Sequence, residues 1–449
     1  MLVRNLTRLA ELHLQGVDLS AEGHNWGRAL SSLPRLRVLN LADCLLSGPI
    51  DSSLAKLRSL SVIRLGRNNI SAPVPEFLGN FSNLTLLELE RCDLRGNFPT
   101  KVFQLPTLQS LDISDNPLLQ GYLPEFFENG SLQTLVLRST NISGKIPDSI
   151  GNLKGLSRMD FSYCSFKGSI PSSIGSLANL VVLELSWNLF SGPIPSSFSM
   201  LKNLTDLNLS DNNLSGQISS IHWENLSYLV NLELLNNLLE GIIPAPLFSL
   251  PSLQTIYLSN NQFSGQIGDL PVVSSSQLAI LDLSSNRLEG LMPSSFFKLQ
   301  SLQMLSLSYN NFSGTLELSI IQKLGNLTWL DLSYNDLMVD DGFFGNIDLT
   351  KFPQLEVLQL ISCKLRKFPI FLRNQSDWLT LDLSDNQIQG EIPNWICNHR
   401  LYYLNLSHNL LTKIEGFFRN NSLVEYLDLH SNQLRGDIFN MPPAAYFID

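Results

Sequence analysis

A pair of carboxylates has the residue types and the spacing that acid–base catalysis would need. Asp160 and Glu184 lie 24 residues apart, which is the spacing of the repeat described below, so we expect them on adjacent strands, one as general acid and one as base. The same strand position carries aspartate in many other repeats, at Asp112, Asp282, Asp331, Asp382 and Asp428. Because the repeat itself accounts for acidic residues there, we predict that the chain is not an enzyme.

The histidines and glycines match no metal or nucleotide site. Metal-ligand spacing is absent among the six histidines, His13, His24, His222, His399, His408 and His430. No glycine-rich phosphate loop of the P-loop or Rossmann type occurs in the sequence. We therefore predict no metal and no cofactor.

At some solvent-facing positions of the repeat, arginines and large aromatic residues replace the usual small polar or acidic residues. Such residues dominate the hot spots of protein interfaces, and guanidinium groups bind carboxylates. The residues predicted to bind a ligand are Arg64, Arg67, Arg91, Arg138, Arg158, Tyr163, Trp187, Tyr257, Tyr309, Trp329 and Tyr334. The alternative is that solvent-facing positions tolerate these side chains without any function.

All these positions are set by a repeat of about 24 residues. Residues 180–195, LVVLELSWNLFSGPIP, read LxxLxLxxNxFxGxIP, in which Leu183 and Leu185 alternate with polar residues as in a short half-buried strand. A period in this range indicates a solenoid. Eighteen coils can be followed by the second leucine of the motif or its equivalent, at Leu12, Leu39, Ile63, Leu87, Leu111, Leu135, Met159, Leu183, Leu207, Leu232, Ile256, Leu281, Leu305, Leu330, Leu358, Leu381, Leu404 and Leu427.

The asparagine that follows each strand is predicted to be structural. A carboxamide can both donate to and accept from backbone groups at the turn, so stacked asparagines should form a ladder through the core. The predicted ladder is Asn68, Asn116, Asn188, Asn212, Asn237, Asn261, Asn286, Asn310, Asn335, Asn386, Asn409 and Asn432.

Beyond the ladder the pattern predicts the opposite side of each coil. Apolar residues recur at every third position, as at Ile150, Leu153 and Leu156, which is typical of a short 3₁₀ segment. The 28-residue step after Leu330 predicts a loop insertion at 338–352. We predict an α/β solenoid of about 18 coils with a parallel concave sheet and a 3₁₀ or loop convex side. It should form a single domain over 1–449, uncapped at both ends.

The amino-acid composition limits the classes of partner that the chain is expected to bind. The net charge of −10 and the pI of about 5.1 argue against nucleic acid or an anionic membrane surface. No segment reads as a signal peptide or a membrane span.

The cysteines and the N-x-S/T sequons are the candidate modification sites of the sequence. Four cysteines, Cys44, Cys92, Cys164 and Cys363, occupy ladder positions in coils that are never adjacent, so we predict buried free thiols and an accessible thiol only at Cys397. The sequons expected to carry glycans are Asn80, Asn129, Asn225, Asn374 and Asn420.

The repeated LxGxIP extension, as in SGPIPSSF, SGKIPDSI and KGSIPSSI, resembles the plant extracellular leucine-rich repeat. Other stretches, LVRNLTRLAELHLQGVDLSAEG, LQGYLPEF, KFPIFLRNQ, GEIPNWI and MPPAAYFID, resemble plant receptor-like proteins of the pathogen-resistance group. The resemblance covers essentially the whole chain. It implies a plant-type leucine-rich-repeat superhelix from an incomplete ectodomain, whose parent lies at the extracellular face of the plasma membrane through a segment missing here.

The resemblance also implies a function in plant defence. The concave face would bind a peptide or a pathogen-derived protein, and the complex would signal through a membrane receptor kinase acting as co-receptor. Two alternatives stay open: the ectodomain of a leucine-rich-repeat receptor kinase, and an inhibitor of cell-wall-degrading enzymes, although the latter resembles a shorter array of about ten coils with disulfide caps.

Overall fold

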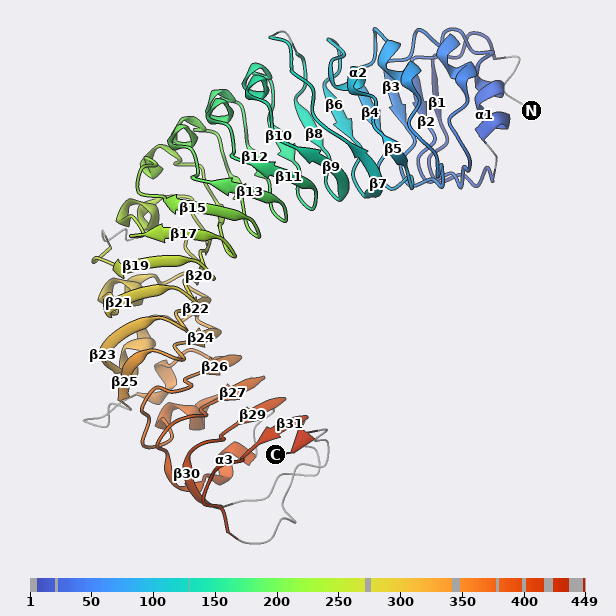
Figure 1. The fold of residues 1–449 in the computed structure, drawn as a ribbon. Helices are drawn as coiled ribbons and strands as arrows, with labels where there is room; N and C mark the ends of the chain where they lie inside the picture. The colour runs from blue at the N-terminus through green and yellow to red at the C-terminus, as the bar shows by residue number, and fades with distance from the viewer. Residues whose placement is uncertain are drawn as a thin grey trace. The chain divides into compact units, whose positions relative to one another are not determined.

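The computed structural model describes residues 6–20, 23–128, 130–270, 276–340, 348–376, 379–397, 401–415, 423–435 and 447–448. The chain divides into two compact units, Met1–Leu239 and Glu240–Asp449, and each is described by itself. Both units are solenoids in which successive coils add parallel strands to a sheet (Figure 1), which confirms the predicted α/β solenoid.

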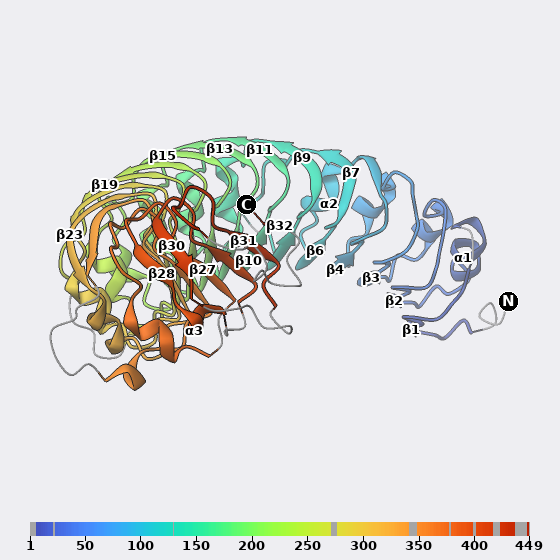
Figure 2. The same cartoon turned by 90° about the horizontal axis from the view of Figure 1, so that it is seen from below.

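The first unit carries two parallel sheets. In its first sheet each strand pairs with the next in the order β1 (Glu11–His13), β2 (Val38–Asn40), β3 (Val62–Arg64), β4 (Leu86–Glu88), β6 (Ser110–Asp112), β8 (Thr134–Val136), β10 (Arg158–Asp160), β12 (Val182–Glu184), β14 (Asp206–Asn208) and β16 (Asn231–Glu233). In its second sheet, seen along one edge in Figure 2, the order is β5 (Arg95–Asn97), β7 (Asn116–Gly121), β9 (Thr140–Gly144), β11 (Ser165–Gly168), β13 (Leu189–Gly192) and β15 (Asn213–Gln217).

The second unit repeats this plan. Its first sheet follows the order β18 (Thr255–Tyr257), β20 (Ile280–Asp282), β22 (Met304–Ser306), β24 (Trp329–Asp331), β26 (Val357–Gln359), β27 (Thr380–Asp382), β29 (Tyr403–Asn405), β31 (Tyr426–Asp428) and β32 (Phe447–Ile448). Its other strands are β19 (Gln262–Gln266), β21 (Arg287–Leu291), β23 (Asn311–Glu317) and β25 (Asp336–Asp340), and the separate pair β28 (Gln389–Ile392) and β30 (Leu410–Ile414). Strand β17 (Leu238–Gly241) contains residues of both units, since the first unit ends at Leu239.

Short helices follow the second-sheet strands in many coils, and most are 3₁₀ helices, as the three-residue apolar period predicts. The α-helices are α1 (Gly23–Leu30), α2 (Thr100–Phe103) and α3 (Asn394–Cys397). The 3₁₀ helices are η2 (Ser52–Lys56), η3 (Glu76–Asn80), η4 (Asp148–Asn152), η5 (Ser172–Ser176), η6 (Ser196–Met200), η7 (Trp223–Asn225), η8 (Ala245–Ser249), η9 (Ser294–Lys298), η10 (Leu318–Lys323), η11 (Leu349–Lys351) and η12 (Ile370–Asn374).

The domain predictions stay predictions. The core of the expected insertion, residues 341–347, lies outside the described residues, while β25 and η11 cover its two ends. A single domain over 1–449 is likewise an expectation, beside the two units described here.

Strand register explains how the repeat builds a core. Leu183 at the centre of β12 is fully buried and lies opposite Leu207 of β14. Its neighbours Val182 and Glu184 are only partly buried, because successive side chains of a strand point to opposite faces. Each coil therefore places its central leucine inside and its flanking residues on the exposed face of the first sheet, which we call the concave face.

The asparagines after the strands form hydrogen bonds inside the coils. Asn188 Oδ1 accepts from the backbone N of Phe166 at 2.9 Å, and its Nδ2 donates to the carbonyl oxygens of Phe161, Leu185 and Ser186 at 2.8, 3.2 and 3.0 Å. These bonds satisfy backbone groups that water cannot reach. Donation from Nδ2 to backbone carbonyls recurs at Asn68, Asn116, Asn212, Asn237, Asn261, Asn286, Asn310, Asn335, Asn386, Asn409 and Asn432.

Cysteine replaces asparagine at four of these positions, and the thiols of Cys44, Cys92, Cys164 and Cys363 are free. Cys92 Sγ donates to the carbonyl oxygen of Leu65 at 3.1 Å, and burial raises the pKa of this thiol to about 12. The prediction that Cys397 is accessible is wrong: this residue ends α3 with its side chain packed inward, 1% exposed.

Candidate functional site

Strand register aligns a row of polar side chains on the concave face of the first unit. Asp160 lies opposite Glu184, Glu184 opposite Asn208, and Asn208 opposite Glu233. Parallel neighbours in a sheet lie about 4.8 Å apart, so these four side chains form one continuous row across β10, β12, β14 and β16.

The residue just before each ladder position, which we call the turn residue, has a left-handed backbone. Aspartate, asparagine and serine are common there, as at Asp211, Asn236 and Ser139, and the short polar side chains of Asn and Asp tolerate this conformation best. Tyr163 and Trp187 are turn residues with φ of 54°. A left-handed backbone costs a residue with a bulky side chain about 1–2 kcal/mol, so these aromatics are present against the local preference.

The two strained aromatics form one wall of the site. The rings of Tyr163 and Trp187 stack with centroids 5.3 Å apart and an interplanar angle of 10°. Their side chains stay 48% and 52% exposed, so the stack presents apolar surface to solvent. Arg138 lies over the Tyr163 ring at 5.7 Å, which is within range for a cation–π contact.

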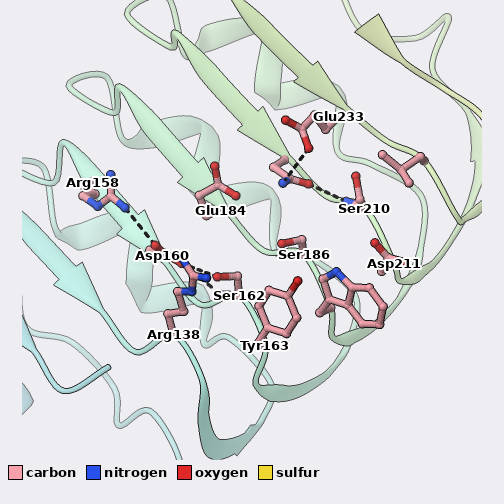
Figure 3. A pocket seen from close by; sticks show the side chains of 13 residues that line it. Arg138, Arg158, Asp160, Ser162, Tyr163, Glu184, Ser186, Ser210, Asp211 and Glu233 are labelled. Atoms are coloured by element: carbon pink, nitrogen blue, oxygen red, sulfur yellow. Dashed lines mark hydrogen bonds and ion pairs between the residues drawn. The ribbon is translucent and has the colours of Figure 1, made fainter. Parts of the chain in front are cut away.

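The row and the aromatic wall enclose a pocket of about 340 Å³. Figure 3 shows Glu184 between the Arg158–Asp160 pair on one side and Glu233 on the other. Arg158 Nη2 lies 3.0 Å from Asp160 Oδ2, and Asp160 is buried. Glu233 Oε2 accepts from Asn208 Nδ2 at 3.0 Å.

Two glutamates of this pocket, Glu184 and Glu233, have raised pKa values. Burial, and next the charges of Asp160 and Glu233, raise the pKa of Glu184 to about 7, while Arg158 acts in the opposite direction. Burial and the charge of Asp206 raise the pKa of Glu233. A cation entering the pocket would relieve this repulsion.

The structure brings together four of the residues predicted from the sequence: Arg138, Arg158, Tyr163 and Trp187 all line the pocket. The other arginines lie on earlier coils. Arg64 Nε is 2.7 Å from Glu88 Oε2 and Arg91 Nε is 2.8 Å from Asp115 Oδ2.

Arg67 is a turn residue with φ of 59°, and its side chain is exposed.

The remaining predicted aromatics belong to the second unit. Tyr309 and Tyr334 stack at 4.4 Å with an interplanar angle of 25°, and burial together with the neighbouring Tyr309 raises the pKa of Tyr334 to about 12. Trp329 on β24 is 39% exposed, and Tyr257 on β18 is partly buried.

Sequence reasoning missed the acidic side of the pocket. The repeat pattern indicates Glu184 only as half of a carboxylate pair, and it does not single out Glu233 or Asp211. Glutamate in place of aspartate or asparagine after the central leucine was the available signal, since it carries the carboxylate further from the sheet.

Three of the five predicted glycosylation residues can be placed. Asn80, Asn225 and Asn374 are exposed, at the ends of η3, η7 and η12. Asn129 and Asn420 lie outside the described residues.

Among the described residues, no three or more histidine, cysteine, aspartate or glutamate side chains are grouped to hold a metal ion. No helix in this part of the chain is both long and apolar enough to span a membrane.

Comparison with family models supports the repeat. A model described as "Leucine rich repeat" matches residues 276–337. A second, "Leucine Rich Repeat", matches residues 35–57, 107–129, 131–153, 155–177, 179–201, 203–224, 252–271 and 379–399.

Individual proteins and structures are similar as well. Receptor-like protein 47 of Arabidopsis thaliana is 46% identical over 63 residues, which are 14% of this chain and 8% of that protein. The plant peptide hormone receptor RGFR1, solved in complex with RGF2, superposes with a TM-score of 0.83 at 31% identity, covering 98% of this chain and 72% of that chain.

The Arabidopsis receptor kinase HAESA, in complex with the peptide hormone IDA and the co-receptor SERK1, superposes with a TM-score of 0.75 at 28% identity, over 96% of this chain and 67% of that chain. The repeat, the two parallel sheets and the asparagine hydrogen bonds agree with these similarities. The chain therefore belongs to the plant leucine-rich-repeat receptors.

Proposed function

We propose that this chain is the ligand-recognition ectodomain of a plant cell-surface immune receptor-like protein of the pathogen-resistance group. It binds a peptide or a pathogen-derived protein on the concave face, at the extracellular face of the plasma membrane, and signals through a partner kinase. The observation that carries the proposal is the exposed Tyr163–Trp187 stack, held in left-handed backbone beside the pocket. Local strain kept at an exposed position is typical of a functional site.

The charges of the pocket indicate the chemistry of the ligand. Arg158 is paired with Asp160, so it is not available to a ligand carboxylate in this arrangement. Glu184 and Glu233 face the same pocket with raised pKa values. The group that fits is a ligand cation, such as an arginine, lysine or amino terminus, lying between these carboxylates and the aromatic faces.

The comparisons support this kind of partner. RGFR1 was solved with RGF2, and HAESA with a peptide hormone and a co-receptor. These partners belong to those proteins. The shared fold supports the proposal that the present chain also takes an extended ligand across its strands.

Selection from a random peptide library displayed on phage tests the site. Trp187→Asn places at this turn the residue found at Asn236 and Asn260, so the backbone is retained while the aromatic surface is lost. We expect peptides selected on the wild-type chain to bind this variant about tenfold or more weakly. Tyr228→Ser, at a 60% exposed tyrosine between η7 and β16, is the matched control and should bind as the wild type does.

Equal binding to the wild type and to Trp187→Asn would reject the pocket as the site. The selected peptides also test the partner: they should promote association with the ectodomain of SERK1, the co-receptor in the HAESA complex. Absence of any peptide-dependent association would count against that partner.

A second candidate is the ectodomain of a receptor kinase, favoured by the likeness to HAESA, itself a receptor kinase. Sequencing the transcript downstream of Asp449 separates a kinase from a short tail.

A further inference from the structure

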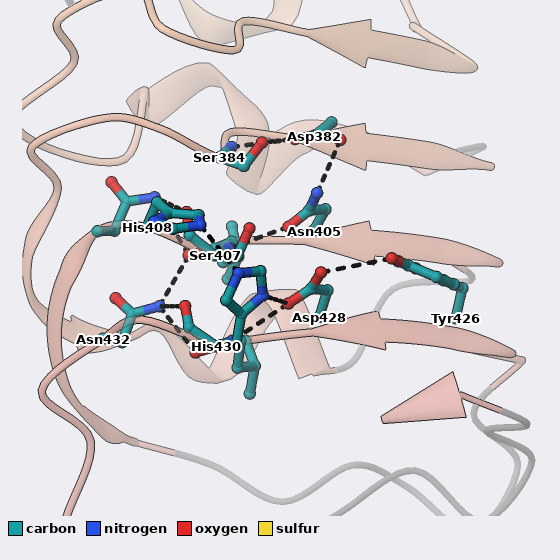
Figure 4. Close-up of polar contacts among 12 residues, drawn as sticks. Asp382, Ser384, Asn405, Ser407, His408, Tyr426, Asp428, His430 and Asn432 are labelled. Carbon is teal, nitrogen blue, oxygen red and sulfur yellow. Dashed lines mark hydrogen bonds and ion pairs between the residues drawn. The ribbon is translucent and has the colours of Figure 1, made fainter. Parts of the chain in front are cut away.

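A second cluster of polar side chains lies in the other unit, on the turns that follow β29 and β31 (Figure 4). His408 Nε2 and His430 Nε2 are 2.9 Å apart. His430 Nδ1 lies 2.6 Å from Asp428 Oδ1. The cluster is separate from the pocket of the first unit, and the inference drawn from it does not depend on the proposed function.

The carboxylate behind His430 sets the direction of its other nitrogen. Asp428 is 6% exposed, and its Oδ1 also accepts from the backbone N of His430 at 3.1 Å. A buried carboxylate beside Nδ1 favours a proton on that nitrogen, which turns the lone pair of Nε2 toward His408. A carboxylate that holds the far nitrogen of a histidine in this way is the usual support of a metal-binding histidine.

The two imidazole rings are inclined to each other. Their centroids are only 4.5 Å apart with an interplanar angle of 82°, so the ring axes meet at an angle instead of facing each other along one line. Nitrogens 2.9 Å apart can both lie about 2.0–2.1 Å from one ion, with an angle of about 90° at that ion. This angle fits tetragonal coordination, which copper(II) and nickel(II) prefer, better than the tetrahedral coordination of zinc.

Backbone hydrogen bonds hold the turn that carries His408 in place. His408 is a turn residue with φ of 52°. Its backbone N donates to the carbonyl oxygen of His430 at 2.9 Å. The next residue, Asn409, is a ladder asparagine that bonds the carbonyls of Leu383, Leu406 and Ser407. Both imidazoles are therefore carried by a backbone that is fixed without the ion.

We propose that His408 and His430 form a two-nitrogen site for a divalent transition-metal ion of the copper(II) or nickel(II) class, with Asp428 as the positioning residue. No third histidine, cysteine or carboxylate among the described residues joins them. Because His408 is exposed, water or a donor group of a second molecule completes the coordination. Metal binding requires that the two facing nitrogens carry no proton.

Titration of the full chain with copper(II), buffered by glycine to suppress weak sites, tests the proposal. We expect one copper ion per chain by calorimetry and an electron paramagnetic resonance spectrum with splitting from two nitrogens. His408→Ser keeps the backbone, since serine occupies the same turn in other coils, as at Ser285, and it should lower the affinity about tenfold or more. Asp428→Asn should lower it about tenfold to hundredfold.

His222→Ser, at an exposed histidine of the first unit, is the matched control and should bind copper as the wild type does. Circular dichroism of each variant verifies that it is folded. Two results would overturn the proposal: unchanged copper affinity in His408→Ser, which would place the ion elsewhere, or no binding to the wild type in competition with glycine, which would leave the two histidines sharing only a proton.

Discussion

At the scale of single residues, Glu184 shows how the repeat is modified to make a site. Its strand position is ordinary, but the longer side chain lies half-buried among Asp160, Asp206 and Glu233. Removal from water and like charge both favour its protonated form. Ionised Glu184 therefore destabilises the folded chain, and its carboxylate is placed to bind a cationic ligand.

The pH dependence of stability follows from the raised pKa. Glu184 titrates at about 7 in the folded chain against 4.5 for an ordinary glutamate, so between these pH values the folded chain binds a proton that the unfolded chain has released. The free energy of unfolding therefore falls as the pH rises from about 4.5 to about 7. Glu184→Gln should flatten this fall and raise the urea midpoint above pH 7, with little change near pH 4.5.

Urea unfolding at both ends of that pH range measures the effect. The matched control is Glu289→Gln, at an exposed glutamate on β21, which should keep the pH dependence of the wild type. If Glu184→Gln shows the same decline as the wild type, the glutamate is not strained in the folded chain.

At the scale of the element, each coil depends on its neighbours through the side chain of one asparagine. Asn188 accepts a hydrogen bond from a backbone N–H of the preceding coil and donates to three backbone carbonyls, one of them in that coil. Its removal leaves buried backbone groups without partners, each at a cost of about 1–3 kcal/mol.

We expect Asn188→Ala to lower the free energy of unfolding by about 3 kcal/mol. Hydrogen exchange should increase first in β11, whose residue Phe166 donates to Asn188, because stability in a solenoid is local to adjacent repeats. Asn213→Ala, at an exposed asparagine that begins β15, is the control and should be neutral. Wild-type protection in β11 of Asn188→Ala would show that the carboxamide contributes little.

The architecture of the coil could be predicted from the sequence because every coil has the same residue types at the same offsets. The positions of Leu183, Asn188 and Gly192 determine the strand, the ladder and the turn, and each is visible as a residue type at a fixed offset. Gly192 has a φ of 79°, a conformation that favours glycine.

Pairing between side chains could not be predicted in the same way. The sequence shows Arg158 on the concave face, but only the structure shows its guanidinium turned toward Asp160 two residues away. The long arginine and glutamate side chains have many rotamers, and their contacts depend on neighbours in other coils. The contact between His408 and His430 could not be predicted either, because the two residues occupy different positions in successive repeats.

At the scale of the whole molecule, the charge supports the ligand chemistry inferred from the pocket. The chain carries a net charge of −10, so a basic ligand is drawn toward it while an acidic one is repelled. Ionic strength should therefore weaken the association rate of a basic peptide more than its dissociation rate.

Photo-cross-linking tests most directly the claim that a ligand binds the concave face of the first unit. A peptide selected on the wild-type chain, carrying benzophenone at each position in turn, would be irradiated on the chain and its attachment sites mapped by mass spectrometry. We predict attachment within β10, β12, β14 and β16 and the turns that follow them, including Tyr163 and Trp187. Attachment confined to the 3₁₀ helices η4, η5 and η6 or to the second unit would contradict it.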